Sequence, residues 1–298
     1  MTRAVYKIVY NREYILIFLK HNKPRKQMNT YTGKIMPTLK RACPFVMLIA
    51  GLAAGSARAD EAQTPAVGSA ISGSFSLDCN SHFISYGSDA WATGSKWNEM
   101  MVHPSLNLKA DLSSNAYCFV GTWLDVNNIS QSRIGSTIQE IDAWVGLGYN
   151  YGKLGLSVTY QEWTYGGDVE RVLDFGASYD TFLHPSITIH NRTDGNGSQK
   201  TGTVAVLGVS EGFDCKGLSV NMCLNGAYNT DEYHGGDSGL TFVSFGPKFS
   251  YPLSKISAAY GNWNLHGDLT YYYTPSDTVP NNPSESFLTG SIGIGVDF

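Results

Sequence analysis

Acidic and basic side chains recur at alternate positions of several segments, where they could share one face of a strand. Glu140 and Asp142, for example, are two residues apart, and side chains at i and i+2 of a strand point the same way. Rings of charged side chains inside a pore bias which ions enter it. Alternatively, such charges pair with one another and brace a filled interior. The candidates for the inward face are Glu140, Asp142, Asp174, Asp268, His266, His190, His103 and Lys109.

Two serines stand close enough to histidines to suggest a nucleophile with its base. Ser105 is two residues from His103, and Ser186 is two residues from His184. A hydrolase is therefore one hypothesis for the chain. The pattern Gly-x-Ser-x-Gly occurs at 208–212, but it falls inside the predicted strand at 201–214 and not at the strand-to-helix turn of a nucleophile elbow. The sequence holds no His-Glu-x-x-His and no phosphate-binding loop, which are motifs of common metalloproteases and nucleotide-binding enzymes. We therefore predict no catalytic residue, cofactor or metal site. Asp231, Glu232, His234 and Asp237 could hold Ca²⁺ in a loop, but a solvated loop explains them better.

The elements that would position these charges are short strands with a period of two residues. In the last segment Leu288, Ile292, Ile294, Val296 and Phe298 lie on one face, and smaller or polar residues occupy the other. Alternation over such lengths, broken by turn signals, indicates half-buried strands. We predict twelve strands, at 70–85, 101–112, 115–127, 138–151, 153–165, 169–180, 185–194, 201–214, 217–230, 239–252, 262–274 and 286–298.

The connections between these strands alternate in length. Short ones fall near 113–114, 152, 181–184 and 215–216, and longer polar ones near 86–100, 128–137, 195–200, 231–238 and 275–285. Short turns at one end and long loops at the other are typical of outer-membrane β-barrels. Aromatic residues near strand ends suit the interfacial girdles of such barrels, and we assign Tyr149, Tyr151, Trp163, Tyr165, Trp263 and 271–273 to them. The alternative is a soluble β-sandwich. We predict an all-β fold, a transmembrane antiparallel up-and-down β-barrel of about 12 strands.

Composition and charge separate the two parts of the chain. Only 15% of the 298 residues are charged, and the chain holds 32 Gly and 18 Tyr, which argues against a coiled coil or a charged disordered chain. Residues 1–59 carry 11 Lys and Arg and one acid, which leaves 10 basic and 24 acidic residues and a net charge of −14 for 60–298. Nucleic-acid affinity depends on Lys and Arg, so no nucleic-acid partner is expected.

The start of the chain looks like an export signal preceded by an extension. Lys40 and Arg41 precede an apolar run from about Cys43 to Ala54, and Ala57-Arg58-Ala59 fits a small-x-small cleavage site. These are the parts of a secretory signal peptide. We predict an N-terminal extension at 1–35, a signal peptide at 36–59, and a barrel at 60–298. Either the protein truly starts at Met28 or Met36, which we favour, or the extension is an unusual leader.

The sequence ends in the pattern Ser291-x-Gly293-x-x-Val296-x-Phe298. This pattern resembles the C-terminal assembly signal of bacterial outer-membrane proteins, with a polar residue, a glycine and a terminal aromatic residue. The resemblance implies a Gram-negative outer-membrane location and the barrel-assembly machinery as a partner.

A second set of motifs covers most of 70–298. It comprises Glu140-x-Asp142, Gly148-Tyr149, Tyr160-x-x-Trp163-x-Tyr165, Glu170, Gly176-x-Ser178-Tyr179-Asp180 and His103-Pro104-Ser105-Leu106-Asn107-Leu108. These motifs are similar to those of the TorF-type porin family. The expected function is a passive channel through outer-membrane lipid for small hydrophilic solutes, with a modest preference for cations. A structural or adhesive barrel with a filled lumen, and a barrel hydrolase, are the alternatives.

Overall fold

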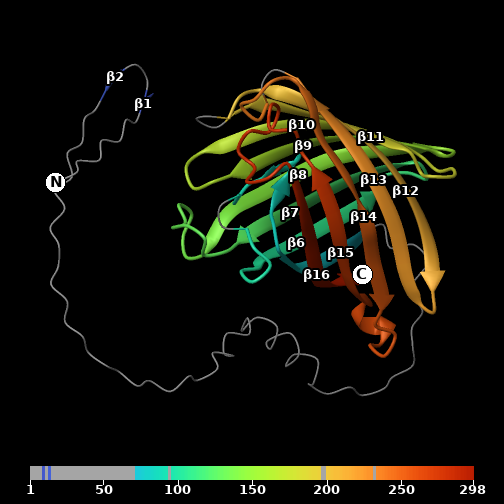
Figure 1. Cartoon of the computed structure of the whole chain (residues 1–298). Coiled ribbons are helices and arrows are strands. Elements are labelled where there is room, and N and C mark those ends of the chain that lie inside the picture. Colours follow the sequence, from blue (N-terminus) through green and yellow to red (C-terminus); the bar gives the residue numbers. More distant parts are fainter. Residues whose placement is uncertain (1–8, 11–12, 15–70, 93–94, 196–198, 231–232) are drawn as a thin grey trace, which may run out of the picture. The chain divides into compact units, whose positions relative to one another are not determined.

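A computed structural model of the chain describes residues 9–10, 13–14, 71–92, 95–195, 199–230 and 233–298 (Figure 1). The chain divides into two units, Met1–Asp60 and Glu61–Phe298. In the first unit, β1 (Val9–Tyr10) pairs antiparallel with β2 (Glu13–Tyr14). The predicted signal peptide at 36–59 lies outside the described residues, as does most of the predicted extension at 1–35, and both stay predictions.

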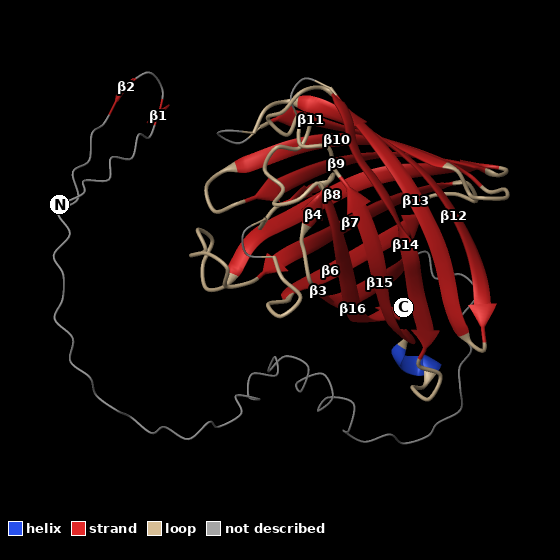
Figure 2. Cartoon of the chain, viewed as in Figure 1, coloured by secondary structure: helices blue, strands red, loops and turns tan. Residues whose placement is uncertain are grey.

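The second unit is a closed barrel of twelve antiparallel strands, which confirms the predicted fold (Figure 2). Each strand pairs with its neighbours in chain order, so the topology is up-and-down. The barrel strands are β3 (Ile71–Asn80), β6 (Met101–Asp111), β7 (Ala116–Val126), β8 (Ile138–Tyr151), β9 (Leu154–Thr164), β10 (Val169–Tyr179), β11 (Ser186–Asp194), β12 (Gly202–Cys215), β13 (Leu218–Asn229), β14 (Gly239–Pro252), β15 (Asn262–Tyr273) and β16 (Ser286–Asp297).

The first and last barrel strands close the sheet. In the register of β3 against β16, Phe75 lies opposite Val296 and Asp78 lies opposite Gly293. Beyond the last pair, the backbones of Gly73 and Phe298 exchange two hydrogen bonds of 2.8 and 2.9 Å. The main-chain N–H and C=O groups of both strands thus find partners within the chain, as a membrane-spanning sheet requires.

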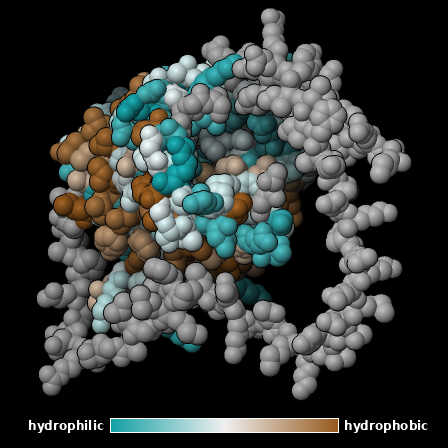
Figure 3. All heavy atoms as spheres, turned by 90° about the vertical axis from the view of Figure 1, so that its left-hand side faces the viewer, coloured by the Kyte–Doolittle hydropathy of each residue, from teal (hydrophilic) through white to brown (hydrophobic). Residues whose placement is uncertain are grey.

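Alternation divides each strand between an apolar outer wall and a more polar lumen. Large apolar side chains remain exposed around the outside, including Leu147 at 54%, Leu207 at 61% and Ile292 at 54%. Figure 3 shows hydrophobic side chains gathered on the outer wall and hydrophilic ones around the hollow of the barrel. An outward apolar band is the surface that a transmembrane barrel presents to lipid. No helix in the described part of the chain has the length and apolarity needed to cross a membrane.

The two ends of the barrel differ in the lengths of their connections. Turns at 112–115, 152–153, 180–185 and 216–217 join strands at one end, where 253–261 is longer and contains the 3-10 turn η1 (Ala258–Tyr260). Most connections at the other end are longer, except 165–168, where the Tyr165 N–H donates to the carbonyl of Asp168. By the usual layout of such barrels, the short turns face the periplasm and the long loops face outward.

The predicted first strand, at 70–85, is too long. β3 ends at Asn80, and a separate two-stranded hairpin follows, formed by β4 (Ile84–Ser85) and β5 (Ser88–Asp89). Tyr86 and Gly87 connect its strands with φ of 48° and 93°, the positive values that two-residue hairpin turns of type I′ need. We call Ile84–Asp89 the inner hairpin, because its side chains pack against the inside of the barrel.

Candidate functional site

Two cavities formed by described residues of the lumen meet at the inner hairpin. An outer chamber of about 630 Å³ is lined partly by the long loops, and an inner chamber of about 450 Å³ is lined mainly by strand residues. Phe83, Ser85, Glu140 and Trp163 line both chambers. We call these four shared residues the neck.

Aromatic stacking holds the tip of the inner hairpin against the barrel wall. The ring of Tyr86 stacks on His190 of β11 with a centroid distance of 3.8 Å and an interplanar angle of 28°. His190 is 0% exposed, and its two ring nitrogens lie 2.8 Å from Asp174 Oδ1 and 2.7 Å from the Tyr233 hydroxyl. Because this imidazole is fixed on both sides, it gives Tyr86 a rigid platform.

Two long loops bind the backbone of the hairpin. His234 Nε2 donates to the Tyr86 carbonyl at 2.9 Å, and Asn282 Nδ2 donates to the Gly87 carbonyl at 2.8 Å. The Asp89 N–H donates to Asn282 Oδ1 at 2.8 Å. These side chains satisfy main-chain groups that would otherwise lack partners. Burial lowers the pKa of His234 to about 4, so at neutral pH it is an uncharged donor.

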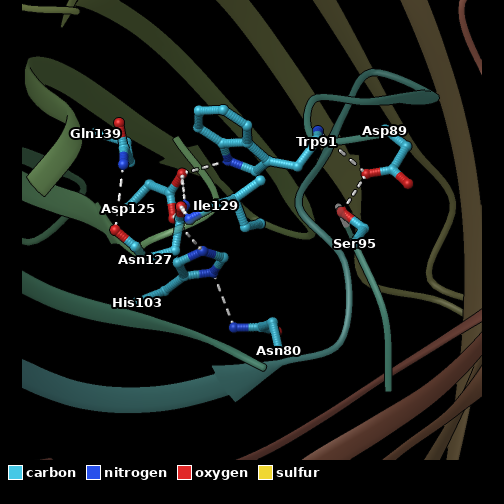
Figure 4. A network of polar contacts seen from close by, with 9 residues as sticks. All are labelled: Asn80, Asp89, Trp91, Ser95, His103, Asp125, Asn127, Ile129 and Gln139. Carbon is cyan, nitrogen blue, oxygen red and sulfur yellow. Dashed lines mark hydrogen bonds and ion pairs between the residues drawn. The ribbon is translucent and has the colours of Figure 1, made fainter. Parts of the chain in front are cut away.

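A polar network anchors the segment that follows the hairpin (Figure 4). Trp91 Nε1 donates to Asp125 Oδ2 at 2.7 Å, and His103 Nε2 donates to Asp125 Oδ1 at 3.1 Å. Asn80 Nδ2 donates to His103 Nδ1 at 2.9 Å. Asp89 is 4% exposed and accepts from the Ser95 hydroxyl at 2.7 Å, and its burial raises its pKa.

The structure places the predicted inward residues on the lumen side but separates them into different environments. Three histidines pair with carboxylates, namely His103 with Asp125, His190 with Asp174, and His266 with Asp78. Asp268 accepts from the Ser291 hydroxyl. Lys109 is 44% exposed near the end of β6 and forms an ion pair of 2.9 Å with Asp111, so it lies apart from the neck.

Glu140 and Asp142 come together beside the neck. Glu140 is 6% exposed and lines both chambers, and Asp142 lines the inner one. Neither forms an ion pair with a basic side chain of the described residues. Asp142 Oδ1 is buried, and the two carboxyl groups are hydrogen-bonded to each other. An acidic pair without a countercharge is therefore a distinctive feature of this lumen.

Sequence reasoning missed several lumen charges. Arg192 Nε lies 2.6 Å from Glu170 Oε2, and both side chains are at least 95% buried. Lys248 lies opposite Asp268 in the pairing of β14 with β15. Arg192 is two residues from His190 and Glu170 four from Asp174, so the same alternation places them inward. The predicted set of inward charges, with four acids and one lysine, was therefore incomplete.

Three of the aromatic assignments were wrong, and one of them is Tyr272, which lines the inner chamber. Trp163 is 7% exposed and points into the lumen, and Tyr165 lines the outer chamber. By contrast, Tyr149, Tyr151 and Tyr271 are exposed on the outer wall, at 46%, 71% and 46%. The structure thus divides the predicted girdle residues between the lipid side and the neck.

The serine–histidine pairs considered from the sequence do not form hydrogen bonds with each other. Both ring nitrogens of His103 are engaged by Asp125 and Asn80. His184 lies in a turn outside the strands and pairs with Asp180 at 3.4 Å. Among the described residues, no three His, Cys, Asp or Glu side chains gather as a metal ion would require.

The C-terminal pattern has the side-chain directions that the sequence indicates. Phe298 is 58% exposed, and Val296 lies on the same face. Ser291 and Gly293 face the lumen, where a Cβ at Gly293 would meet Asp78 Oδ1 and His266 Nε2. Gly293 thus leaves the space in which Asp78 pairs with His266. That the assembly machinery reads this strand stays a prediction.

Comparisons with known proteins find similar folds but no family. No family and no curated protein matches the sequence, so the likeness to the TorF-type family stays a prediction. The structure is similar to "KdgM porin in complex with disordered oligogalacturonate", with a TM-score of 0.42, 9% identity, and coverage of 76% of this chain and 99% of that one. It is also similar to outer membrane phospholipase A from Escherichia coli, with a TM-score of 0.41, 11% identity, and coverage of 76% of this chain and 92% of that one. A third similar structure is the Salmonella typhi OmpF complex with daunomycin, with a TM-score of 0.38, 10% identity, and coverage of 76% of this chain and 97% of that one.

These low scores and identities carry no functional argument, and porins and an enzyme stand side by side among the similar structures. The fold rests on this chain's own strand pairing and on its apolar outer wall. A closed antiparallel barrel with that wall is built to cross an outer membrane. The chain is an outer-membrane β-barrel protein.

Proposed function

We propose that the barrel is a passive channel for small hydrophilic solutes, narrowed by the inner hairpin and modestly selective for cations. The observation that supports it is the pair of chambers, of about 630 and 450 Å³, which share the neck residues as lining. Twelve strands enclose a lumen between the filled interior of eight-stranded barrels and the open channel of porins, so one inward segment suffices to set its width.

The cation preference follows from Glu140 and Asp142. A low-dielectric wall focuses the field of carboxylates that have no countercharge. Most other lumen carboxylates are paired, such as Glu170 with Arg192 and Asp174 with His190. The preference is modest because salt screens it, with a Debye length of about 10 Å at 0.1 M and about 3 Å at 1 M.

Single-channel recording in planar bilayers tests this function. We expect discrete conductance steps and, in a KCl gradient, a reversal potential that indicates cation selectivity at low salt and fades at 1 M. The variant E140Q/D142N should lose most of the selectivity. Asp180→Asn, in a periplasmic turn, is the matched control and should keep it. Anion selectivity at low salt would contradict the role of the acid pair.

The second candidate is a structural barrel with a closed lumen. It is favoured by the hydrogen bonds through which His234 and Asn282 hold the inner hairpin in place. Absence of conductance in a correctly folded preparation would support this candidate over the channel. We propose no catalytic activity, and hydrolysis of lipid or peptide by the purified protein would contradict that.

A further inference from the structure

Strand pairing places a row of uncharged residues on the lumen side of the wall, from β11 to β15. Neighbouring members lie directly opposite each other in the pairing of adjacent strands, and the row runs through Ser186, Gly208, Asn225, Ser244 and Tyr272. We call these five residues the neutral row. Asn225, Ser244 and Tyr272 line the inner chamber, so uncharged hydrogen-bonding groups from three neighbouring strands converge on one cavity.

Gly208 sets the position of the Asn225 amide within this row. A Cβ built on Gly208 would lie 2.8 Å from Asn225 Oδ1 and 2.8 Å from Ser186 Oγ, so glycine allows both polar atoms to approach β12 closely. On the other side, Asn225 Nδ2 donates to Ser244 Oγ at 3.2 Å. No described residue donates a hydrogen bond to Asn225 Oδ1. The amide is therefore held in place and still offers an acceptor to a solute.

Three hydroxyl groups of the inner chamber are open in the same way. Ser85 of the inner hairpin, Thr188 of β11 and Tyr272 of β15 line the cavity, and their hydroxyls form no hydrogen bond with the rest of the described chain. Thr188 and Tyr272 are only half-buried, so both keep surface in the chamber. A hydroxyl group both donates and accepts. A solute that carries several hydroxyl groups of its own can therefore pair with all of them.

The remaining lining suits the carbon skeleton of such a solute and disfavours negative charge. Phe83, Trp123 and Phe242 give the cavity apolar edges, and Phe83 packs on Trp123 with 4.9 Å between ring centroids. Glu140 and Asp142 lie across the barrel, because β8 and β14 are six strands apart in either direction around the closed sheet. Their carboxyl groups accept from hydroxyls but repel an anion. The volume of about 450 Å³ is typical of small-molecule sites.

We propose that the inner chamber binds an uncharged sugar, a ring solute with several hydroxyl groups. Asn225, Ser244 and Tyr272 hydrogen-bond its hydroxyls, and the aromatic edges contact its C–H groups. An ion or an amino acid brings charge that the neutral row does not balance. A purely apolar ring leaves the polar groups of the chamber without partners. The site names a solute class for the proposed channel and rests on that function.

Saturation-transfer NMR of the folded barrel in detergent, titrated with D-glucose, measures weak binding without requiring conduction. We expect saturable binding of glucose and at least tenfold weaker binding of glucuronate, which carries a carboxylate on the same ring. Cyclohexanol, which has a six-membered ring but only one hydroxyl, should not displace glucose. Asn225→Leu and Tyr272→Phe should each weaken binding roughly two- to tenfold through lost neutral hydrogen bonds. Gly208→Ala should weaken it similarly, because the added Cβ displaces the Asn225 amide.

Two matched controls should bind glucose like the wild type. Asn221→Leu changes the same residue type on the same face of β13, outside the residues that line the chamber. Gly226→Ala adds a Cβ to a glycine of the same strand that has nothing within 4 Å. Retention of the heat-modifiable form on a gel confirms that each variant is folded.

Swelling of liposomes that contain the barrel separates the failure of the site from the failure of the channel. With both correct, glucose enters the liposomes and the barrel binds it saturably. Swelling without glucose binding, or equal affinities of Asn225→Leu and the wild type, overturns the site and leaves the channel standing. Glucose binding without swelling overturns the channel alone. Glucuronate binding as tight as that of glucose, or displacement of glucose by cyclohexanol, also overturns the site for an uncharged sugar.

Discussion

Replacing Gly87 by alanine should release the inner hairpin and widen the channel. Gly87 has a φ of 93°, and a Cβ built on it would lie 2.8 Å from Cδ1 of Phe242. The substitution therefore adds backbone strain and a steric clash at once. It removes no hydrogen bond, since Gly87 contributes only its carbonyl to Asn282.

The expected size of the effect follows from these two costs. A left-handed conformation costs a residue with a Cβ about 1–2 kcal/mol, and an extra carbon in a packed site costs about 1–3 kcal/mol. Together they destabilise the seated hairpin by about 2–5 kcal/mol. Since about 1.4 kcal/mol corresponds to a factor of ten in an equilibrium constant, the lower value raises the ratio of released to seated hairpin about 30-fold.

Single-channel recording of Gly87→Ala should show a larger conductance, or more frequent openings, than the wild type. Gly217→Ala is the matched control, because Gly217 has a φ of 85° but has nothing within 4 Å of its Cβ position. It lies in the turn between β12 and β13, so it should lower stability slightly and leave conductance unchanged. A folded Gly87→Ala barrel with wild-type conductance and gating would refute the role of the hairpin as the constriction.

Three further predictions concern the wall, the seam and pH. Gly293→Val should displace His266 and lower the unfolding midpoint in urea, whereas an unchanged midpoint would show that the lumen there adapts. Deleting Phe298 should reduce the heat-modifiable folded fraction in membranes, and normal assembly would count against the C-terminal signal. Burial lowers the pKa of His234 from its usual 6.5 to about 4, so acid favours the released state in which this imidazole is free. Relative to His234→Gln, the wild type should gain about 20-fold in the released-to-seated ratio between pH 7 and pH 5, and identical pH profiles would contradict the bond to Tyr86.

Most of the barrel could be predicted from the sequence because each strand separates lipid from lumen. That boundary imposes a strict two-residue period, so the predicted strand ends of β6 to β16 agree with the structure within about two residues. The exception is the end of β3. The run from His82 to Tyr86 continues the alternation of the strand, so the sequence predicts that the strand continues too. In the structure Phe83 instead packs on Trp123 inside the barrel, with 4.9 Å between the ring centroids. An aromatic residue that faces lipid and one that faces the lumen have the same sequence pattern.

The candidate site could be predicted only in part. Alternation correctly placed Glu140 and Asp142 inward, because it depends on neighbours within one strand. It could not identify which charges pair, because pairs such as Asp78 with His266 join strands that meet only when the barrel closes. The inner hairpin was missed for a related reason, since its partners His234 and Asn282 come from distant loops.

The seam between β3 and β16 has a consequence for the speed of folding. Every other pair of barrel strands is adjacent in chain order and can form by zipping of successive hairpins. The seam alone joins strands from opposite ends of the barrel sequence, and contacts between distant residues form slowly because the intervening chain must first lose entropy. A nearly complete but open sheet is therefore the natural kinetic intermediate. Substitutions at the seam, such as those at Phe75 or Val296, should slow its closure more than equivalent changes within a hairpin.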